Sequence, residues 1–349
     1  MNKPSVPASP YLSPPRPRGA DGEVRKVGVE LEIGHLTLER TLEIVREAMG
    51  GEIDVQSRTV GAVRDTPLGK FKVEVDSKPL QERRYLRPLE ALGLESDSST
   101  AQVLEDSVLQ VARELVPIEI VSPPIPWDRM HELDPLWALL REAGVEDTRS
   151  SVLHAFGLHF NPEPPDFHVE TILNALRGFL LLEDWISVAS DIDLSRKIAP
   201  YIRGFPESYR RKVLELAYRP TWDEFVDDFI QDNPTRNRPV DLMPLIAHIG
   251  APGLAERVED WSLVKPRPTY HYRLPNSEVA QANWTPAADW NRWVQVERVA
   301  EDPALLRELC KAYLETTDLP LRMQRGGWVD TIRERLSLPG APAAHASTG

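Results

Sequence analysis

The segment at residues 27–34 constrains the fold of this chain more than any other feature of the sequence. Apolar side chains alternate there with glycines and carboxylates, so that Val27, Val29, Leu31 and Ile33 fall on one side and Gly28, Glu30, Glu32 and Gly34 on the other. A period of two is typical of a β-strand. Glu30 and Glu32 then start only about 7 Å apart on the polar side.

Two interpretations of this strand follow from the charge on its polar side. At an effective dielectric of about 20, two negative charges at that spacing repel by roughly 2.4 kcal/mol, so a buried site requires a compensating cation such as a metal ion. A half-solvated antiparallel strand with its polar side in water needs no such cation. Both interpretations stay open on this segment alone.

The length and composition limit the class of protein. With 349 residues, of which 41% are hydrophobic, the chain can bury a large core in one elaborated domain or in two. A net charge of −13 argues against a nucleic-acid or membrane-surface binder, because both partners are polyanionic. The single cysteine, Cys310, excludes an internal disulfide. Without an apolar run of roughly 18 to 20 residues, we expect a soluble, cytoplasmic protein.

The two ends of the chain differ from the rest in composition. Residues 1–22 contain six prolines and few large apolar side chains, and residues 338–349 are rich in alanine, proline, serine and glycine. Such segments bury too little apolar surface to offset the entropy of ordering. We therefore expect a disordered leader over 1–22, a single folded domain over 23–337 and a disordered tail over 338–349.

The first half of the chain predicts a mixture of strands and helices. After the opening strand, a helix is expected to begin at Leu38 with Thr37 as its N-cap and to end at Gly50. Period-two patterns predict further strands, and a helical pattern follows near 100–115. The expected strands are residues 53–63, 70–76, 118–121 and 154–161.

The second half is mostly helical by its pattern, with one strand-like interruption at residues 270–273. The expected helices lie near 168–190, 206–217, 221–231, 241–249, 286–300, 302–316 and 327–336. The strands each carry polar groups on one side, which predicts an α+β fold. We expect an antiparallel sheet with a polar, concave face and helices packed on its other side. Mg²⁺ suits this face because hard cations prefer carboxylate oxygens.

Individual polar residues leave alternatives open. His159 is either a hydrogen-bonded core histidine or a metal ligand. Lys70 and Lys72 either contact phosphates or keep an exposed strand soluble. Arg273 either neutralises a phosphoryl group or an oxyanion, or forms a structural salt bridge.

Common nucleotide and hydrolase motifs are missing from the sequence. There is no G-x-x-x-x-G-K-[ST] loop, no G-x-G-x-x-G after a strand and no G-x-S-x-G elbow. The stretch from His131 to Asp134 lacks the second histidine of H-E-x-x-H. Any ATP must therefore be held through metal ions.

Six ordered segments resemble those of the putative amidoligases, which are carboxylate–amine ligases related in fold to glutamine synthetase and glutamate–cysteine ligase. The segments are GVELE at 28–32, VEVDS at 73–77, IEIVSPP at 118–124, GLHFNP at 157–162, RPVDLMP at 238–244 and PTYHYR at 268–273. They span roughly residues 26–300. The resemblance implies a glutamine synthetase-like catalytic fold.

The resemblance also implies site residues and a reaction. It implies ATP bound with two or three Mg²⁺ ions, phosphorylation of a substrate carboxylate and attack of an amine on the acyl phosphate. The implied metal ligands are Glu30, Glu32, Glu119 and His159. The implied catalytic residues are Arg273, Glu119 and Asp76, where Asp76 either deprotonates the attacking amine or is a solvated strand-end carboxylate. The implied cofactor-binding residues are Lys70, Lys72, Asn161, His271 and Arg238.

Two residues depart from the pattern of the broader superfamily. Asn161 stands where a second histidine is found, and His271 stands where a glutamate is found two residues before the arginine. Together the two changes remove negative charge that would hold a third metal ion. A catalytically inactive nucleotide- or peptide-binding module of the same fold is therefore an alternative, and a metal-dependent phosphotransferase or hydrolase is a third.

The expected partners follow from the same reading. They are a small-molecule or peptide carboxylate and an amine, with no nucleic acid and no membrane. A homo-oligomer or an association with a partner biosynthetic enzyme is compatible with the sequence.

Overall fold

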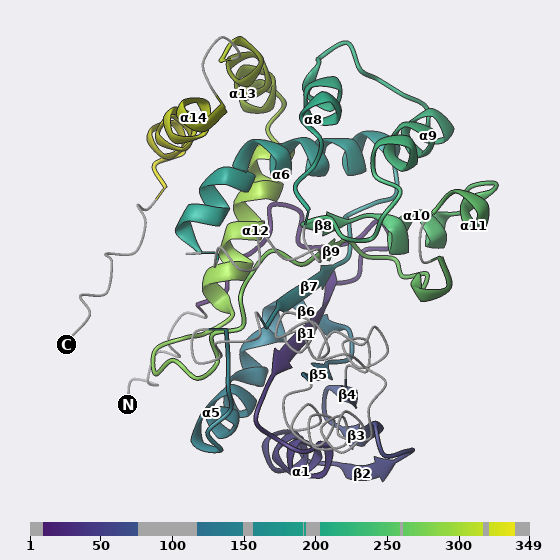
Figure 1. Cartoon of the computed structure of the whole chain (residues 1–349), viewed down its shortest axis with the longest axis vertical. Coiled ribbons are helices and arrows are strands. Elements are labelled where there is room, and N and C mark those ends of the chain that lie inside the picture. The colour runs from purple at the N-terminus through teal and green to yellow at the C-terminus, as the bar shows by residue number, and fades with distance from the viewer. Residues whose placement is uncertain are drawn as a thin grey trace, which may run out of the picture.

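The centre of the protein is an antiparallel sheet that runs through the molecule (Figure 1). The computed structural model describes residues 10–75, 117–148, 156–190, 192, 203–258, 261–316 and 321–338. In these residues nine strands pair in the order β2-β3-β4-β5-β1-β7-β9-β8, and β6 also pairs with β1. Every pairing between these strands is antiparallel. The predicted α+β class is confirmed.

The strands and helices occur in a mixed first half and a mostly helical second half. The strands are β1 Lys26–Ile33, β2 Glu52–Val55, β3 Val60–Thr66, β4 Gly69–Val75, β5 Ile118–Val121, β6 Ile125–Pro126, β7 Leu158–Pro162, β8 Val240–Asp241 and β9 His271–Tyr272. The α-helices are α1 Leu38–Met49, α5 Asp134–Glu142, α6 Val169–Ala189, α8 Glu207–Leu214, α9 Trp222–Asp232, α10 Met243–Ile249, α11 Leu254–Arg257, α12 Ala287–Ala300, α13 Pro303–Glu315 and α14 Leu321–Leu336. The described residues also form two 3₁₀ helices, η2 Trp127–Leu133 and η3 Trp261–Leu263.

Helices cover the apolar face of the sheet. Near β3, α1 approaches so closely that a Cβ on Gly61 would lie 2.6 Å from Leu42 Cδ1, which explains the glycine. Near β7 and β9, the ring of Phe160 lies 6.4 Å from Tyr272 and 6.1 Å from Trp290 of α12, while Phe179 of α6 packs on Tyr272. These contacts leave the opposite, polar face of the sheet for other groups.

Local signals set the ends of α1 as predicted. The Thr37 side chain accepts a hydrogen bond from the backbone N–H of Arg40, and the helix ends at Gly50, whose φ is 74°. A left-handed residue at a helix end favours glycine. The N-cap and the stop are both confirmed.

One expected strand is instead a hairpin. Residues 53–63 divide into β2 and β3, because the backbone N–H groups of Gln56 and Ser57 both donate to the carbonyl of Val60. Ser57 also accepts a hydrogen bond from the backbone N–H of Thr59. Polar residues that satisfy one another locally favour a turn over a continued strand.

The second half contains the predicted helices, but α8 ends at Leu214 rather than at 217, α14 begins at Leu321 rather than at 327, and residues 241–249 are divided between two elements. There β8 takes Asp241 into the sheet, and α10 begins only at Met243, whose backbone N–H donates to the Asp241 side chain. Helix α14 packs against α6, and Trp328 Nε1 donates to the carbonyl of Leu181. The expected helix near 100–115 lies outside the described residues.

The expected disordered leader is wrong for residues 10–22. Tyr11 is buried, the backbone N–H of Leu12 donates to Asn291, and Trp290 Nε1 donates to the carbonyl of Leu12. The segment has little core of its own, but α12 supplies the apolar surface and the polar partners that order it. Residues 1–9 and the tail at 339–349 lie outside the described residues.

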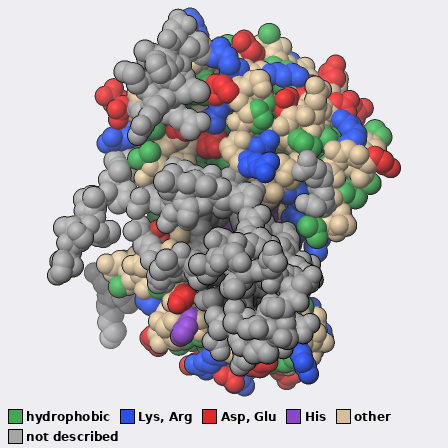
Figure 2. Space-filling view, viewed as in Figure 1, with side chains coloured by type: hydrophobic (Ala, Val, Ile, Leu, Met, Phe, Trp, Pro, Cys, Tyr) green, Lys and Arg blue, Asp and Glu red, His purple; other side chains and the backbone are tan. Residues whose placement is uncertain are grey.

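The surface is mixed in charge, and acidic and basic side chains are interspersed over the helical part of the face in Figure 2. Among the helices of the described ranges, none is long and apolar enough to cross a bilayer.

Candidate functional site

The strand register gathers polar residues on one face of the sheet. Glu32 of β1 lies opposite Glu119 of β5, and Glu119 lies opposite Glu74 of β4. On the other side of β1, Glu30 lies opposite His159 of β7. Directly opposed side chains have Cβ atoms about 4.5–5.5 Å apart, so residues far apart in sequence can act together here.

Glu30 is almost fully buried and is held by three side chains. Its Oε1 accepts hydrogen bonds from Asn161 Nδ2 at 2.9 Å and from an Arg267 guanidinium nitrogen at 2.5 Å. Its Oε2 lies 3.4 Å from His159 Nδ1. Burial raises the pKa of this carboxyl, but the hydrogen bond with His159 is the largest of several effects that outweigh it and hold the pKa well below its usual value; the charge of Arg267 acts in the same direction with a smaller effect.

His271 fixes the orientation of Asn161. Its Nδ1 lies 2.8 Å from Asn161 Oδ1. Because the other end of the amide donates to Glu30, this oxygen accepts and His271 Nδ1 donates. Burial lowers the pKa of His271 well below its usual value, so the ring is neutral and Nε2 carries a lone pair.

His159 belongs to two groups of ligand-capable side chains. Glu30, His159 and His271 form a buried group, and Glu32, Glu119 and His159 form a more exposed one, with the ligand atoms of each within 4.8 Å of one another.

In the exposed group, His159 Nε2 lies 3.9 Å from Glu32 Oε1. The backbone N–H of Gly157 donates to Glu32 Oε2 at 2.6 Å and orients it. Two opposed carboxylates repel each other unless a cation lies between them, and with an imidazole they make a donor set that fits a divalent ion.

The lysines predicted to bind the cofactor lie on β4, beside the acidic row. Lys72 forms an ion pair with Glu74 on the polar face, and Lys70 is exposed on the same face. Sequence reasoning did not select Glu74 as a site residue, although the alternation of residues 70–76 placed it on the charged side. The structure brings Lys72 near the exposed group through Glu74, which lies opposite Glu119.

Arg273 lies beyond His271, in a second charged cluster at the other end of the polar face. One of its guanidinium nitrogens donates to the carbonyl of Arg236 at 3.0 Å. Arg236 Nε lies 3.6 Å from the buried Asp241, which is opposite His271 in the register of β8 and β9. Burial raises the pKa of Asp241, and the charges of Arg236 and Arg273 oppose that shift.

Two further predicted residues are not brought to this face by the described contacts. The guanidinium of Arg238 donates to the backbone carbonyls of Arg203, Gly204 and Asp232. These carbonyls belong to two backbone segments, 203–204 and 232, and the arrangement gives no support to a role in cofactor binding. Asp76, the expected base, lies outside the described residues.

Arg267 is a further site residue that sequence reasoning missed. It comes from the loop before β9, its side chain is 37% exposed, and it forms an ion pair with Glu30. A lone arginine in a loop has no periodicity, so no pattern pointed to it.

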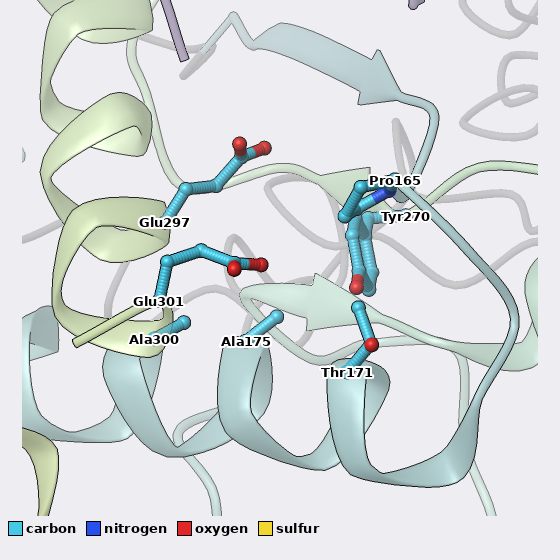
Figure 3. A pocket seen from close by; sticks show the side chains of 7 residues that line it. All are labelled: Pro165, Thr171, Ala175, Tyr270, Glu297, Ala300 and Glu301. Atoms are coloured by element: carbon cyan, nitrogen blue, oxygen red, sulfur yellow. The ribbon is translucent and has the colours of Figure 1, made fainter. Parts of the chain in front are cut away.

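A separate small pocket lies on the helical side of the sheet (Figure 3). Its lining includes Glu297 of α12, Glu301 directly after that helix, Thr171 and Ala175 of α6, and Tyr270. Glu297 is already paired with Arg25, so this carboxylate has a structural partner. The clusters on the polar face are the better candidates for chemistry.

Comparison with known proteins points to one family. A family model described as "Putative amidoligase enzyme" matches residues 23–295, which include all nine strands of the sheet and both groups around His159. Searches of the curated proteins and of the solved structures found no match. The family match covers more than three quarters of the chain, and we conclude that the chain belongs to the putative amidoligase family.

Proposed function

We propose that this protein is an ATP- and Mg²⁺-dependent carboxylate–amine ligase that forms an amide or isopeptide bond. Membership of an amidoligase family supports a ligase-type activity. The observation that carries the proposal is the meeting of Glu32, Glu119 and His159 on one polar face, with ligand atoms within 4.8 Å of one another.

Glu32, Glu119 and His159 are the proposed ligands of a divalent ion. Such an ion, when bound, neutralises charge on the phosphates of ATP during an in-line phosphoryl transfer. The hydrogen bond between Glu30 and His159 Nδ1 would hold the ring so that Nε2 faces Glu32.

Charged side chains at the two ends of the face have proposed roles in binding substrates. Lys72, at the β4 end, would contact ATP phosphates. Arg273, at the β9 end, would stabilise negative charge on the substrate oxygens. The substrate carboxylate would take the γ-phosphoryl group and release ADP. The amine would then attack the acyl carbon, lose a proton and release phosphate.

An ADP-release assay over panels of carboxylates and amines tests the proposal. The expected result is ADP release that requires Mg²⁺ and both substrates, with a matching amide product detected by mass spectrometry. Glu119→Gln should abolish this release, whereas Glu142→Gln, at an exposed position of α5, should not. ATP binding without any amide from any substrate pair would end the ligase proposal.

The second candidate is a non-catalytic nucleotide- or peptide-binding module of the same fold. The observation that favours it is the hydrogen bonding of Asn161. This side chain binds His271 through its oxygen and Glu30 through its nitrogen, so both of its polar atoms already have partners within the protein. Calorimetry with ATP and Mg²⁺ separates the candidates. A module would bind the nucleotide with no turnover, and Glu119→Gln would weaken binding without changing any rate.

A further inference from the structure

Glu30 is surrounded by hydrogen-bond donors. Arg267 and Asn161 both donate to its Oε1, and His159 Nδ1 lies 3.4 Å from its Oε2. A metal ion needs lone pairs from its ligands, and the groups that face Glu30 present N–H bonds instead. The donor set around this carboxylate therefore fits an anion-holding network better than a metal site.

The orientation of Asn161 is itself fixed, because its oxygen accepts from His271 Nδ1 at 2.8 Å. To present that oxygen to an ion at Glu30, the amide would have to turn and break both of its hydrogen bonds. His271 thus keeps the N–H side of Asn161 toward Glu30.

The neighbouring group has the opposite character. Glu32 and Glu119 are directly opposed carboxylates, both only partly buried, and the nearest nitrogen of His159 is the one turned away from Glu30. Here two like charges and an imidazole lone pair converge. The ligand atoms of Glu32, Glu119 and His159 lie within 4.8 Å of one another, whereas the carboxylate of Glu30 is already bound by the guanidinium of Arg267.

We propose that Arg267 replaces a divalent ion at Glu30, so that the site takes one divalent ion, on Glu32, Glu119 and His159. This inference rests on the proposed metal-dependent function and assigns the number of ions. It gives Arg267 and Glu30 positioning roles: Arg267 holds the Glu30 carboxylate, which holds the ring of His159. It differs from the expectation that Glu30 is a metal ligand in a site of two or three ions.

Counting bound Mn²⁺ on the full-length protein tests this proposal without substrate or turnover. In a titration followed by electron paramagnetic resonance, the wild type is expected to bind one Mn²⁺ ion. Arg267→Gln is expected to bind two, because Glu30 then lacks its cation and can share an ion with the Nε2 lone pair of His271, which belongs to the same buried group of ligand-capable side chains. Arg267→Lys keeps a cation near Glu30 and is expected to bind one. Glu30→Gln is expected to retain one ion with an affinity lowered roughly 10- to 100-fold.

Arg257→Gln is the matched control. Arg257 lies away from the sheet, is 36% exposed and forms an ion pair with Asp227. Its exposure is close to that of Arg267, and its partner is likewise a carboxylate. It should bind one ion. Two ions on the wild type, or one ion on Arg267→Gln, would overturn the proposal. Absence of any bound Mn²⁺ from the wild type would overturn it together with the metal dependence of the proposed function. A protein that binds one ion but forms no amide would leave it standing.

Discussion

Two buried glutamates, Glu297 on the helical side of the sheet and Glu30 on its polar face, are each 5% exposed and each paired with an arginine. Both nitrogens of the Arg25 fork bind Glu297, at 2.6 and 2.8 Å, and Trp293 Nε1 donates to the same carboxylate at 2.7 Å. Glu30 instead receives one nitrogen of the partly exposed Arg267, together with an amide and an imidazole.

The difference lies in where each network ends. Arg25 spends its other hydrogen bonds on the carbonyls of Arg16 and Glu163, so its network closes on the backbone of neighbouring segments. The network of Glu30 ends at His159 Nε2, beside the less buried Glu32. We call the Arg25–Glu297 network closed, because its hydrogen bonds all end on other groups of the protein, and such a network stabilises the fold. The Glu30 network instead ends at a ring nitrogen beside carboxylates, and such an end can bind a ligand.

The largest expected effect is on the closed network. Arg25→Ala should lower the free energy of unfolding by about 3–5 kcal/mol, because it leaves the Glu297 charge buried without its partner. Urea unfolding followed by circular dichroism measures this loss. Arg257→Ala, at a 36% exposed site, is the control and should change stability by less than about 1 kcal/mol. Equal losses for the two variants would contradict the comparison.

The next largest expected effect is a loss of Mn²⁺ affinity on the polar face. Glu119→Gln should weaken Mn²⁺ binding by roughly 100-fold or more, since changes in outer-shell residues alone cost about 10- to 100-fold. Calorimetry measures the affinity. Glu74→Gln is the matched control, because Glu74 lies in the same row but is paired with Lys72, and its effect should be no more than a few-fold. Similar losses at both positions would show that only the total charge matters.

A smaller effect concerns pH. Burial keeps His271 neutral in the native state, with a pKa well below its usual 6.5, so below pH 6.5 the unfolded chain binds a proton that the native protein does not. This contribution to stability is complete above pH 6.5 and is lost as the pH falls from 6.5 toward the native pKa, by up to about 1.4 kcal/mol per pH unit.

Free energies of unfolding measured between pH 7.5 and 5.5 test this for the wild type and for His271→Asn. The variant should have a flatter profile in that range. Parallel profiles would mean that His271 is protonated as readily in the native state as in the unfolded chain.

The smallest expected effect is the loss of stability from Arg267→Gln. The side chain is 37% exposed and binds Glu30 through one nitrogen, and Asn161 and His159 still bind the buried Glu30 in the variant, so the free energy of unfolding should fall by only about 1 kcal/mol. Thermal unfolding without metal measures it. A loss as large as that of Arg25→Ala would place Arg267 among the structural residues and remove the contrast between the two glutamates.

Much of the fold could be predicted because its signals are local. The alternation in β1 predicted which face holds Glu30 and Glu32, and the Thr37 cap and Gly50 stop predicted the ends of α1. The strand at 118–121 matches β5 at both ends. Periodicity and capping act over a few residues, so the sequence carries them directly.

The sequence-based predictions for residues 10–22 and for Arg238 were not borne out, and they share a cause. The segment at 10–22 is ordered by contacts with Trp290 and Asn291 of α12, and Arg238 is spent on backbone oxygens of segments up to 35 residues away. Each depends on a neighbour that is distant in the chain. No local pattern records such a neighbour.

The sequence by itself determined that one strand carries two carboxylates on a single face, that histidine and amide side chains share the polar side of another strand, and that helices follow. Only the tertiary structure decided which carboxylates stand opposite each other and which one meets a guanidinium. The reason is that side-chain alternation is a property of each strand alone. The register between strands, and the contact between the loop that carries Arg267 and Glu30, depend on how separate segments pack.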